Sequence, residues 1–312
     1  MLGFRDLPLE PPAPGQLLVR NRVVGVNFID TYQRSGVYPL ELPARLGQEA
    51  VGIVEQVGSG VRDVDVGQRV AYVSCLGAYA ERHLIPSERA IQVPDDLDDA
   101  SVAAALLKGM TVEYLIGRTF RVERGQTVLW HAAAGGTGLL ACQWLAELGV
   151  RVIGTVGSDA KAELALAHGC AEAIVYTREN FVERVRELTG GAGVPVVFDS
   201  VGRSTFEGSL DCLKPRGMLV SFGNASGKPS LSDVTLLARK GSLFLTRPTL
   251  AHYTESTEEL RASARALFEV MRRGAVRPVI GQRFALSEVR EAHAALEARR
   301  TVGSTILLVD QG

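Results

Sequence analysis

Short β-rich runs separated by glycine and proline fill the first third of the chain. The runs at 16–26, 50–57, 69–73 and 79–85 are rich in valine, leucine and isoleucine, and turn residues such as Gly58-Ser59-Gly60 stand between them. Runs of this length, bounded by turn residues, are typical of β-strands. We therefore expect a twisted, barrel-like all-β unit in this part of the chain.

Near Asp98 the spacing of apolar residues changes to that of helices, which we expect at 100–107 and 111–119. Strands then alternate with helices. The strands are expected at 128–132, 152–156, 173–176, 196–199, 218–222 and 242–246, and the helices at 137–148, 159–168, 180–189 and 204–213. This alternation predicts βαβ units and a doubly wound parallel sheet.

After the sixth strand, two helices at 257–273 and 288–300 lead to a last apolar strand at 304–309. The simplest architecture is an α/β fold in which one domain is inserted into another. We expect a dinucleotide-binding Rossmann domain at 109–247 and a β-rich catalytic domain made of 1–108 with 248–312.

The composition is that of an ordinary globular enzyme. The chain has 312 residues, 46% of them hydrophobic and 22% charged, which is enough for two domains. A net charge of -1 argues against a nucleic-acid partner. Four cysteines lie far apart without a CxxC pair, as in a reducing compartment. With no signal peptide or membrane span expected, these features predict a cytoplasmic protein.

The glycine-rich turn after the strand at 128–132 is the main functional motif. Ala133-Ala134-Gly135-Gly136-Thr137-Gly138 leads directly into a helix, as in the dinucleotide fingerprint with Ala133 at its first glycine. Small residues there allow a tight turn, close approach of the pyrophosphate, and helix packing. The helix N-terminus offers N–H groups and a positive dipole end to phosphates. No GK[ST] follows, which excludes a P-loop.

The end of the second strand indicates which nucleotide binds. In NAD-binding domains an acidic residue there holds the ribose 2′-hydroxyl. Val156 occupies that position, and Asp159 lies in the following loop, where we do not expect it to substitute. The missing acid favours NADPH over NADH.

Small and basic residues follow Val156. Gly157 and Ser158 leave room for a 2′-phosphate, Lys161 on the first helical turn can reach it, and Tyr176 can add a hydroxyl. Lysine occurs only at positions 108, 161, 214, 228 and 240, so its presence directly after the missing acid is informative. The alternative is that Lys161 is an ordinary surface lysine.

Several motifs together resemble a known family. AAAGGTG followed by Gln143, VNFIDTYQRSGVYP at 26–39, DSVG at 199–202 and VSFGNASG at 220–227 are similar to the quinone oxidoreductases. These form the zinc-free, ζ-crystallin-like branch of the medium-chain dehydrogenase/reductase superfamily, and the similarity covers nearly the whole chain. The resemblance implies a GroES-like catalytic domain and a homodimer. It also implies an N-terminal strand upstream of Met1, or an open sheet edge.

The same resemblance assigns site residues. Asn27, Tyr32 and Tyr38 would be catalytic and, with Thr111, would border the nicotinamide and the substrate. The pyrophosphate would lie on the turn from Ala133 to Gly138, contacting Gly135, Gly136, Thr137 and Gly138. Residues around the 2′-phosphate would be Gly157, Ser158, Lys161, Tyr176 and Arg299. Those along the nicotinamide half would be Phe222, Gly223, Asn224, Phe244, Thr246 and Arg247, although Tyr32 and Phe244 could equally be core residues.

No zinc is expected. Zinc enzymes of the superfamily place Cys where this chain has Asn27, His in a Gly-His-Glu motif that here reads Gly47-Gln48-Glu49, and another Cys near 106–111, where none occurs. Amide and apolar side chains do not replace thiolate or imidazole as zinc ligands. Without a Lewis acid, alcohol oxidation loses the means of stabilising an alkoxide.

Hydride transfer to an electron-poor acceptor requires mainly orientation, which favours reduction of a quinone by NADPH. No histidine or carboxylate presents itself as a general acid, so Tyr38, Tyr32 or solvent would supply the proton. One alternative is a reductase of α,β-unsaturated ketones or aldehydes. A second, from another class, is a nucleotide-binding redox sensor or RNA-binding protein, against which the charge of -1 argues.

Overall fold

The chain folds into two compact units, and the computed structural model describes residues 2–310. The first unit runs to Met110 and continues at Thr254–Arg272 and from Pro278 onward. The second comprises Thr111–Tyr253 with Arg273–Arg277. The second unit is therefore inserted into the first, and the chain passes between them near Met110 and Tyr253 rather than at 108 and 247.

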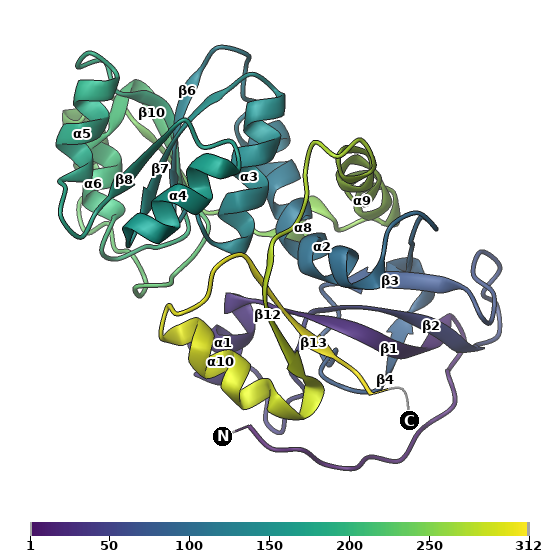
Figure 1. Cartoon of the computed structure of the whole chain (residues 1–312). Helices are drawn as coiled ribbons and strands as arrows, with labels where there is room; N and C mark the ends of the chain where they lie inside the picture. The colour runs from purple at the N-terminus through teal and green to yellow at the C-terminus, as the bar shows by residue number, and fades with distance from the viewer. Residues whose placement is uncertain (1, 311–312) are drawn as a thin grey trace. The chain divides into compact units, whose positions relative to one another are not determined.

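A mainly antiparallel sheet forms the first unit. Its order is β12 (Ile280–Ala285), β13 (Ser304–Leu308), β1 (Gln16–Val26), β2 (Glu49–Val57), β3 (Arg69–Val73) and β5 (Ile91–Gln92), with β4 (Arg82–Pro86) also paired to β1. β1 lies in the middle of the sheet. β2 pairs with one edge of β1, whereas β4 pairs with the first part of its other edge and β13 with the last part. The C-terminal strands β12 and β13 thus complete a sheet that begins near the N-terminus (Figure 1).

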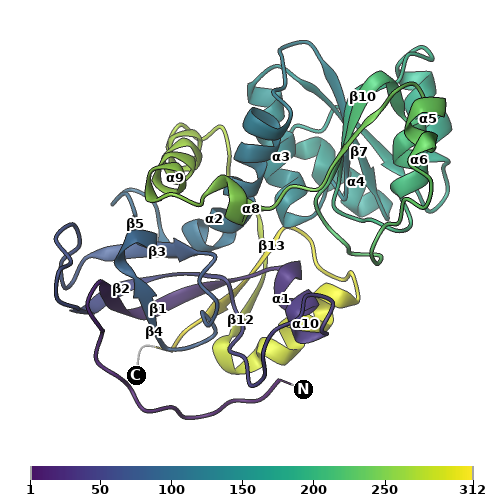
Figure 2. The same ribbon diagram turned by 180° about the vertical axis from the view of Figure 1, so that it is seen from behind.

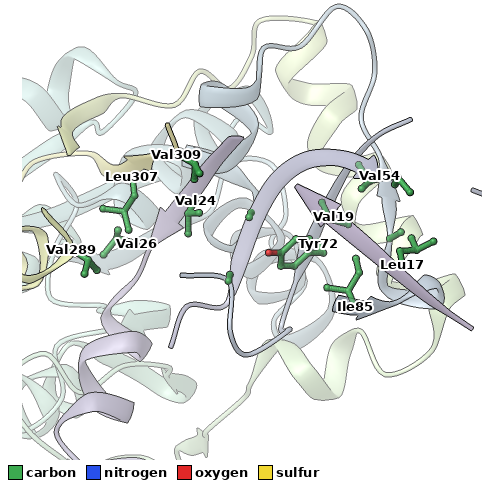
Figure 3. Packing of buried hydrophobic residues seen from close by; sticks show 14 of the residues in the cluster. Leu17, Val19, Val24, Val26, Val54, Tyr72, Ile85, Val289, Leu307 and Val309 are labelled. Carbon is green, nitrogen blue, oxygen red and sulfur yellow. The ribbon is translucent and has the colours of Figure 1, made fainter. Parts of the chain in front are cut away.

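The core of this unit lies against β1. Leu17 and Val19 share one face, and beyond a register irregularity Val24 and Val26 do the same (Figure 3). Strand side chains alternate between faces, so the irregularity is what allows both pairs to reach the same core. Tyr72 is also fully buried in this cluster.

Four helices belong wholly or partly to the first unit: α1 (Phe28–Arg34), the first part of α2 (Asp99–Tyr114), α9 (Thr257–Arg272) and α10 (Val289–Glu297). α1 and α10 lie side by side in both views (Figures 1 and 2). Two short 3₁₀ turns, η1 (Ser87–Arg89) and η3 (Leu286–Glu288), complete it. α1, β12 and the short strand β5 were not predicted from the sequence.

Six parallel strands form the sheet of the second unit. Their order is β11 (Phe244–Thr246), β10 (Leu213–Ser221), β9 (Val194–Asp199), β6 (Thr127–His131), β7 (Arg151–Val156) and β8 (Glu172–Val175). The order reverses between β6 and β9. Such a switch point, at the carboxyl ends of the strands, is where doubly wound sheets bind ligands.

Helices cover both faces of the parallel sheet. α3 (Gly136–Glu147) and α4 (Asp159–Ala167) lie on one face, and α5 (Phe181–Leu188) and α6 (Phe206–Asp211) on the other (Figures 1 and 2). The short helices α7 (Thr235–Arg239) and α8 (Leu250–Tyr253) flank β11 in sequence. The expected Rossmann arrangement is confirmed.

The expectation of two separate helices at 100–107 and 111–119 was wrong. α2 continues through Lys108 and Gly109 and runs into a π-helical segment, η2 (Leu115–Thr119). Gly109 lies within the helix rather than at a break. The lack of a side chain there permits close packing, since a Cβ would lie 2.4 Å from Leu267 of α9. The continuous stretch Asp99–Thr119 could span a membrane by length and composition alone, but 67% of its apolar 18-residue window is buried within the molecule, as in a core helix.

Adjacent leucines on β13 test the packing of the first unit. Leu307 is fully buried, whereas Leu308 is 40% exposed on the opposite face. Leu307→Ala should lower the free energy of unfolding by about 2–5 kcal/mol, because it removes buried methyl groups and leaves a cavity. Leu308→Ala, the control, should change it by only about 0.5 kcal/mol. Equal losses in urea denaturation would contradict this assignment of faces.

Candidate active site

The glycine turn joins β6 to α3. Ala132 adopts a positive φ of 56°, and Gly135 precedes the first helical residue, Gly136. A Cβ on Gly138 would lie 2.3 Å from the carbonyl oxygen of Ala132, so this position must be glycine for the helix to approach the strand end. Gly135 is less constrained, since its nearest atom would be 3.3 Å away. The turn therefore has the compactness that a pyrophosphate site requires.

The carboxyl ends of β7 and β8 lie side by side. Ser158 caps α4, and its Oγ accepts a hydrogen bond of 3.4 Å from the backbone N–H of Lys161. The Tyr176 hydroxyl lies against Gly157, where an added Cβ would be 3.0 Å from it. Val156 is buried. Small residues, a lysine and a tyrosine thus meet at the position where NAD-binding domains carry an acid.

Asp159 is bound by an arginine that the sequence analysis did not single out. Arg178 approaches both carboxylate oxygens, at 2.7 and 2.5 Å, and both side chains are largely exposed. Arg178 follows Tyr176 by two residues, directly after β8. Asp159 is the first residue of α4 rather than part of the loop expected from the sequence, and the guanidinium neutralises it, which makes the surroundings of Lys161 more favourable for an anion.

The turn after β10 contains three of the residues assigned to the nicotinamide half. A Cβ on Gly223 would lie 2.2 Å from the carbonyl oxygen of Ser200, so the turn after β10 touches the turn after β9 through backbone atoms. Arg247 donates to Gly223 O at 3.0 Å and to Asn224 Oδ1 at 3.2 Å. Phe222 packs against Trp130 with centroids 5.6 Å apart. On the edge strand β11, Phe244 is 57% exposed and is not a core residue.

A buried polar chain supports these turns. Asp199 accepts from the N–H groups of Val201 and Gly202 through one oxygen, at 2.8 and 3.0 Å. Its other oxygen accepts from Ser209 at 3.0 Å, and Ser209 Oγ lies 3.0 Å from Nε2 of His131. Burial lowers the pKa of His131, which keeps the imidazole neutral. The DSVG motif thus has a structural role in fixing the turn.

The catalytic residues assigned in the first unit gather at α1. Asn27 precedes this helix, and its backbone N–H donates to Asp30 Oδ2 at 2.8 Å. Tyr32 and Tyr38 meet edge to face, with centroids 5.4 Å apart, and both are half-buried.

Arg299 also belongs to the first unit, after α10, with a φ of 56°. Thr111 lies on α2 at the start of the second unit and is 9% exposed.

A cluster of buried charged groups lies next to Asn27. This cluster was not predicted from the sequence. Glu49 is fully buried; it accepts from Asn27 Nδ2 at 2.8 Å and from the N–H of Leu107 at 2.7 Å. Lys108 Nζ lies 3.7 Å from Glu49 Oε1. Gly25 makes room for the carboxylate, since a Cβ there would be 2.2 Å from Glu49 Oε1. Its contacts thus join β1, β2, α1 and α2.

Burial changes the proton affinities in this cluster. It raises the pKa of Asp30 to about 7 and also raises the pKa of Glu49, whereas it lowers the pKa of Lys108. Hydrogen bonds from Asn27 and Tyr79 to Asp30 oppose the effect of burial. The sequence held a partial signal, because Asp30 and Glu49 flank apolar strand and helix positions and Lys108 is one of few lysines.

A hydrogen-bonded chain leads from Asp30 to the surface. The Tyr79 hydroxyl donates to Asp30 Oδ2 at 2.8 Å and lies 3.0 Å from Nε2 of His293 on α10. Arg34 lies 3.4 Å from Nδ1 of His293 and also pairs with Glu297. Because Arg34 can only donate, Nδ1 accepts and Nε2 carries the hydrogen toward Tyr79.

Within residues 2–310, no three His, Cys, Asp or Glu side chains come together in a way that could hold a metal ion. At the Gly47-Gln48-Glu49 position, Gln48 donates to Gln33 at 3.0 Å. The two amides are therefore bonded to each other.

Two family models match the chain: the "Alcohol dehydrogenase GroES-like domain" over residues 13–95 and the "Zinc-binding dehydrogenase" over 136–268. The quinone oxidoreductase of Pseudomonas aeruginosa is 52% identical over 99% of this chain and 95% of its own length. The chain belongs to the quinone oxidoreductase family. This confirms the resemblance drawn from its motifs.

Solved structures agree with the family. The Escherichia coli quinone oxidoreductase, crystallised as a complex with NADPH, has a TM-score of 0.96 and 45% identity, covering 97% of this chain and 94% of that one. A 2-haloacrylate reductase has a TM-score of 0.87 and 44% identity, covering 98% and 94%. A relative of that name from Burkholderia is also 44% identical.

Two glycines of the turn test its geometry. Gly138→Ala should lower the free energy of unfolding by about 1–3 kcal/mol, because the methyl group meets a backbone oxygen that cannot move freely. Gly135→Ala is the matched control and should cost less than about 1 kcal/mol, since its nearest atom is 3.3 Å away. Chemical denaturation compares them. A reversed order would refute the assignment of Gly138 as the close-packing position.

Proposed function

We propose that this protein is an NADPH-dependent quinone reductase that works without zinc. The observation that carries the proposal is the set of residues at the end of β7 in a member of this family. Small residues and Lys161 replace the ribose-binding acid at the end of β7, and Arg178 neutralises Asp159. A 2′-phosphate is thereby favoured over a free ribose hydroxyl.

The residues of the second unit fit the cofactor. The backbone from Ala133 to Gly138 is compact enough for a pyrophosphate at the N-terminus of α3, contacting Gly135, Gly136 and Thr137. Around the 2′-phosphate we place Gly157, Ser158, Lys161 and Tyr176; the family resemblance adds Arg299, which belongs to the first unit. Along the nicotinamide half we place Thr111, Phe222, Gly223, Asn224, Phe244, Thr246 and Arg247. When bound, NADPH supplies the electrons of the reduction.

On the acceptor side, Asn27 presents an amide that Glu49 orients, and the Tyr32 and Tyr38 rings offer flat apolar surface beside it. Aromatic side chains pack well against a planar acceptor. Their hydroxyls add donors for its oxygens. We propose that these three residues bind and orient the quinone.

A second candidate is reduction of an activated carbon–carbon double bond. It is favoured by the 44% identity to a 2-haloacrylate reductase, whose name describes such a substrate. Both acceptors are electron-poor and conjugated, and both require a hydride followed by a proton. The same residues would serve either reaction.

We also propose a cytoplasmic homodimer. The described cysteines are all free thiols, as in a reducing compartment. β11 ends the parallel sheet, and its outer edge, beside the exposed Phe244, is suited to pairing with a second copy. A native mass of twice 33.5 kDa would support the dimer, and a monomeric mass would refute it.

Parallel assays test the activity. With NADPH, the protein should reduce 1,4-naphthoquinone faster than a simple enone or 2-chloroacrylate, and a chelator should leave the rate unchanged because no metal acts in the reaction. Metal analysis should find well under one zinc per chain. A faster rate with the alkene would favour the second candidate. Chelator-sensitive activity with stoichiometric zinc would overturn the zinc-free proposal.

Lys161→Ala tests the cofactor preference. A charge-assisted hydrogen bond to the 2′-phosphate contributes about 1.5–3 kcal/mol, so its loss should raise KM for NADPH roughly ten- to a hundred-fold. KM for NADH should hardly change, and kcat should hold because the contact lies far from the hydride. Lys214→Ala, an exposed lysine of the same unit, is the control. Equal weakening of both cofactors would contradict this pocket.

A further inference from the structure

Two buried polar atoms in the cluster beside Asn27 have no hydrogen-bond partner. They are Nζ of Lys108, on α2, and Oδ1 of Asp30, on α1. One is a donor with three hydrogens and the other an acceptor, and both belong to side chains within the core of the first unit. A buried polar group without a partner costs about 1–3 kcal/mol, so a pair of complementary kind requires an explanation.

The charge of the cluster supplies one. Asp30, Glu49 and Lys108 together would carry a net charge of -1 if all were ionised, and burying an uncompensated charge is unfavourable. Binding one proton makes the cluster neutral. The outer groups that face it, Arg34 and Glu297, form an ion pair and cancel each other. Neutral His293 and Tyr79 lie between.

The extra proton belongs on Asp30. Oδ2 of this residue already accepts from the Asn27 N–H and from Tyr79, which leaves Oδ1 to carry a hydrogen. Its pKa of about 7, raised by burial, means that the carboxyl exchanges this proton near neutral pH. The lowered pKa of Lys108 makes its ammonium a stronger acid than an exposed lysine.

We propose that Lys108 donates the proton that the reduced acceptor takes up, and that Asp30 stores the proton that restores Lys108. The inference rests on the proposed function. It assigns a general acid to the reaction, where Tyr32, Tyr38 and solvent were the earlier candidates. Lys108 is placed for this role because Nζ of Lys108 and Nδ2 of Asn27 approach the same oxygen, Oε1 of Glu49, at 3.7 and 2.8 Å.

Hydride addition to a quinone leaves one oxygen anionic. An N–H bond of Lys108 breaks and an O–H bond forms on that oxygen, which gives the hydroquinone and a neutral amine. The O–H bond of Asp30 then breaks and its proton returns to Lys108 Nζ. Asp30 recovers a proton from solvent along Tyr79 and His293, toward the partly exposed Arg34.

The first experiment uses the protein without cofactor and compares the melting temperatures of wild type and Asp30→Asn between pH 4 and 8. Because the folded pKa lies above the ordinary value of 3.8, proton binding by Asp30 stabilises the fold. That contribution is complete below about pH 4 and is lost as the pH rises through about 7. The wild type should therefore lose stability relative to Asp30→Asn over this range. Parallel curves would overturn the proton store.

The second experiment measures kcat against pH with NADPH and two quinones. With 1,4-naphthoquinone, the wild-type rate should fall as the pH rises through about 7. Asp30→Asn should be slower at pH 6 by roughly a hundredfold, a typical contribution of a general acid, and should show no such fall. Lys108→Met should show a similar loss. Asp65→Asn, an exposed carboxyl of the same unit, should retain the wild-type profile.

Acceptor acidity separates proton donation from a structural role. Tetrachloro-1,4-benzoquinone gives a much more acidic hydroquinone, which needs no proton from the protein, so both variants should lose far less activity with it. An equal loss with both quinones would overturn the proposal. If Lys108→Met does not fold, Asp30→Asn alone decides. If the wild type reduces neither quinone, the proposed function fails, and the melting curves still decide whether Asp30 holds the proton.

Discussion

Burial of the Glu49 carboxylate is the interaction on which the first unit depends most. One oxygen accepts from Asn27, at the start of α1, and the other from the backbone of α2 at Leu107. The approach is possible only because Gly25 has no side chain. Removing either hydrogen-bond donor would leave one oxygen of the buried carboxylate without a partner, which costs more than the hydrogen bond itself stabilises. The geometry of Asn27 is therefore fixed by the fold.

The second unit depends on close approach of backbone atoms. Gly138 brings α3 against the end of β6, and Gly223 brings the turn after β10 against Ser200. These contacts place N–H groups and carbonyls at the switch point of the sheet, while the buried carboxylate of Asp199 fixes the turn after β9. A rigid turn suits cofactor binding, since little conformational entropy is lost when the nucleotide is held.

Periodicity in the sequence predicted most of the fold. The parallel strands and their helices were found within a few residues, because buried strands and long amphipathic helices have distinct apolar spacings. Several short or irregular elements were missed, and for α1 and β12 the reasons are physical. α1 has only 7 residues, too few to show a period, and β12 is half-exposed, so its pattern is weak. α2 was divided in two because Gly109 resembles a break, whereas it serves packing against Leu267.

The candidate site was predictable only where a short motif carries the chemistry. The turn from Ala133 to Gly138 is contiguous, and the function proposed for it follows from its small residues. Asp30, Glu49 and Lys108 are distant in sequence, and single carboxylates and lysines are ordinarily surface residues. Their function arises from desolvation, which exists only in the folded protein. Under the zinc-free proposal, the reaction still requires a way to neutralise the reduced acceptor. A buried ammonium supplied with protons by a carboxyl of raised pKa meets that requirement, because it delivers charge and proton in one step.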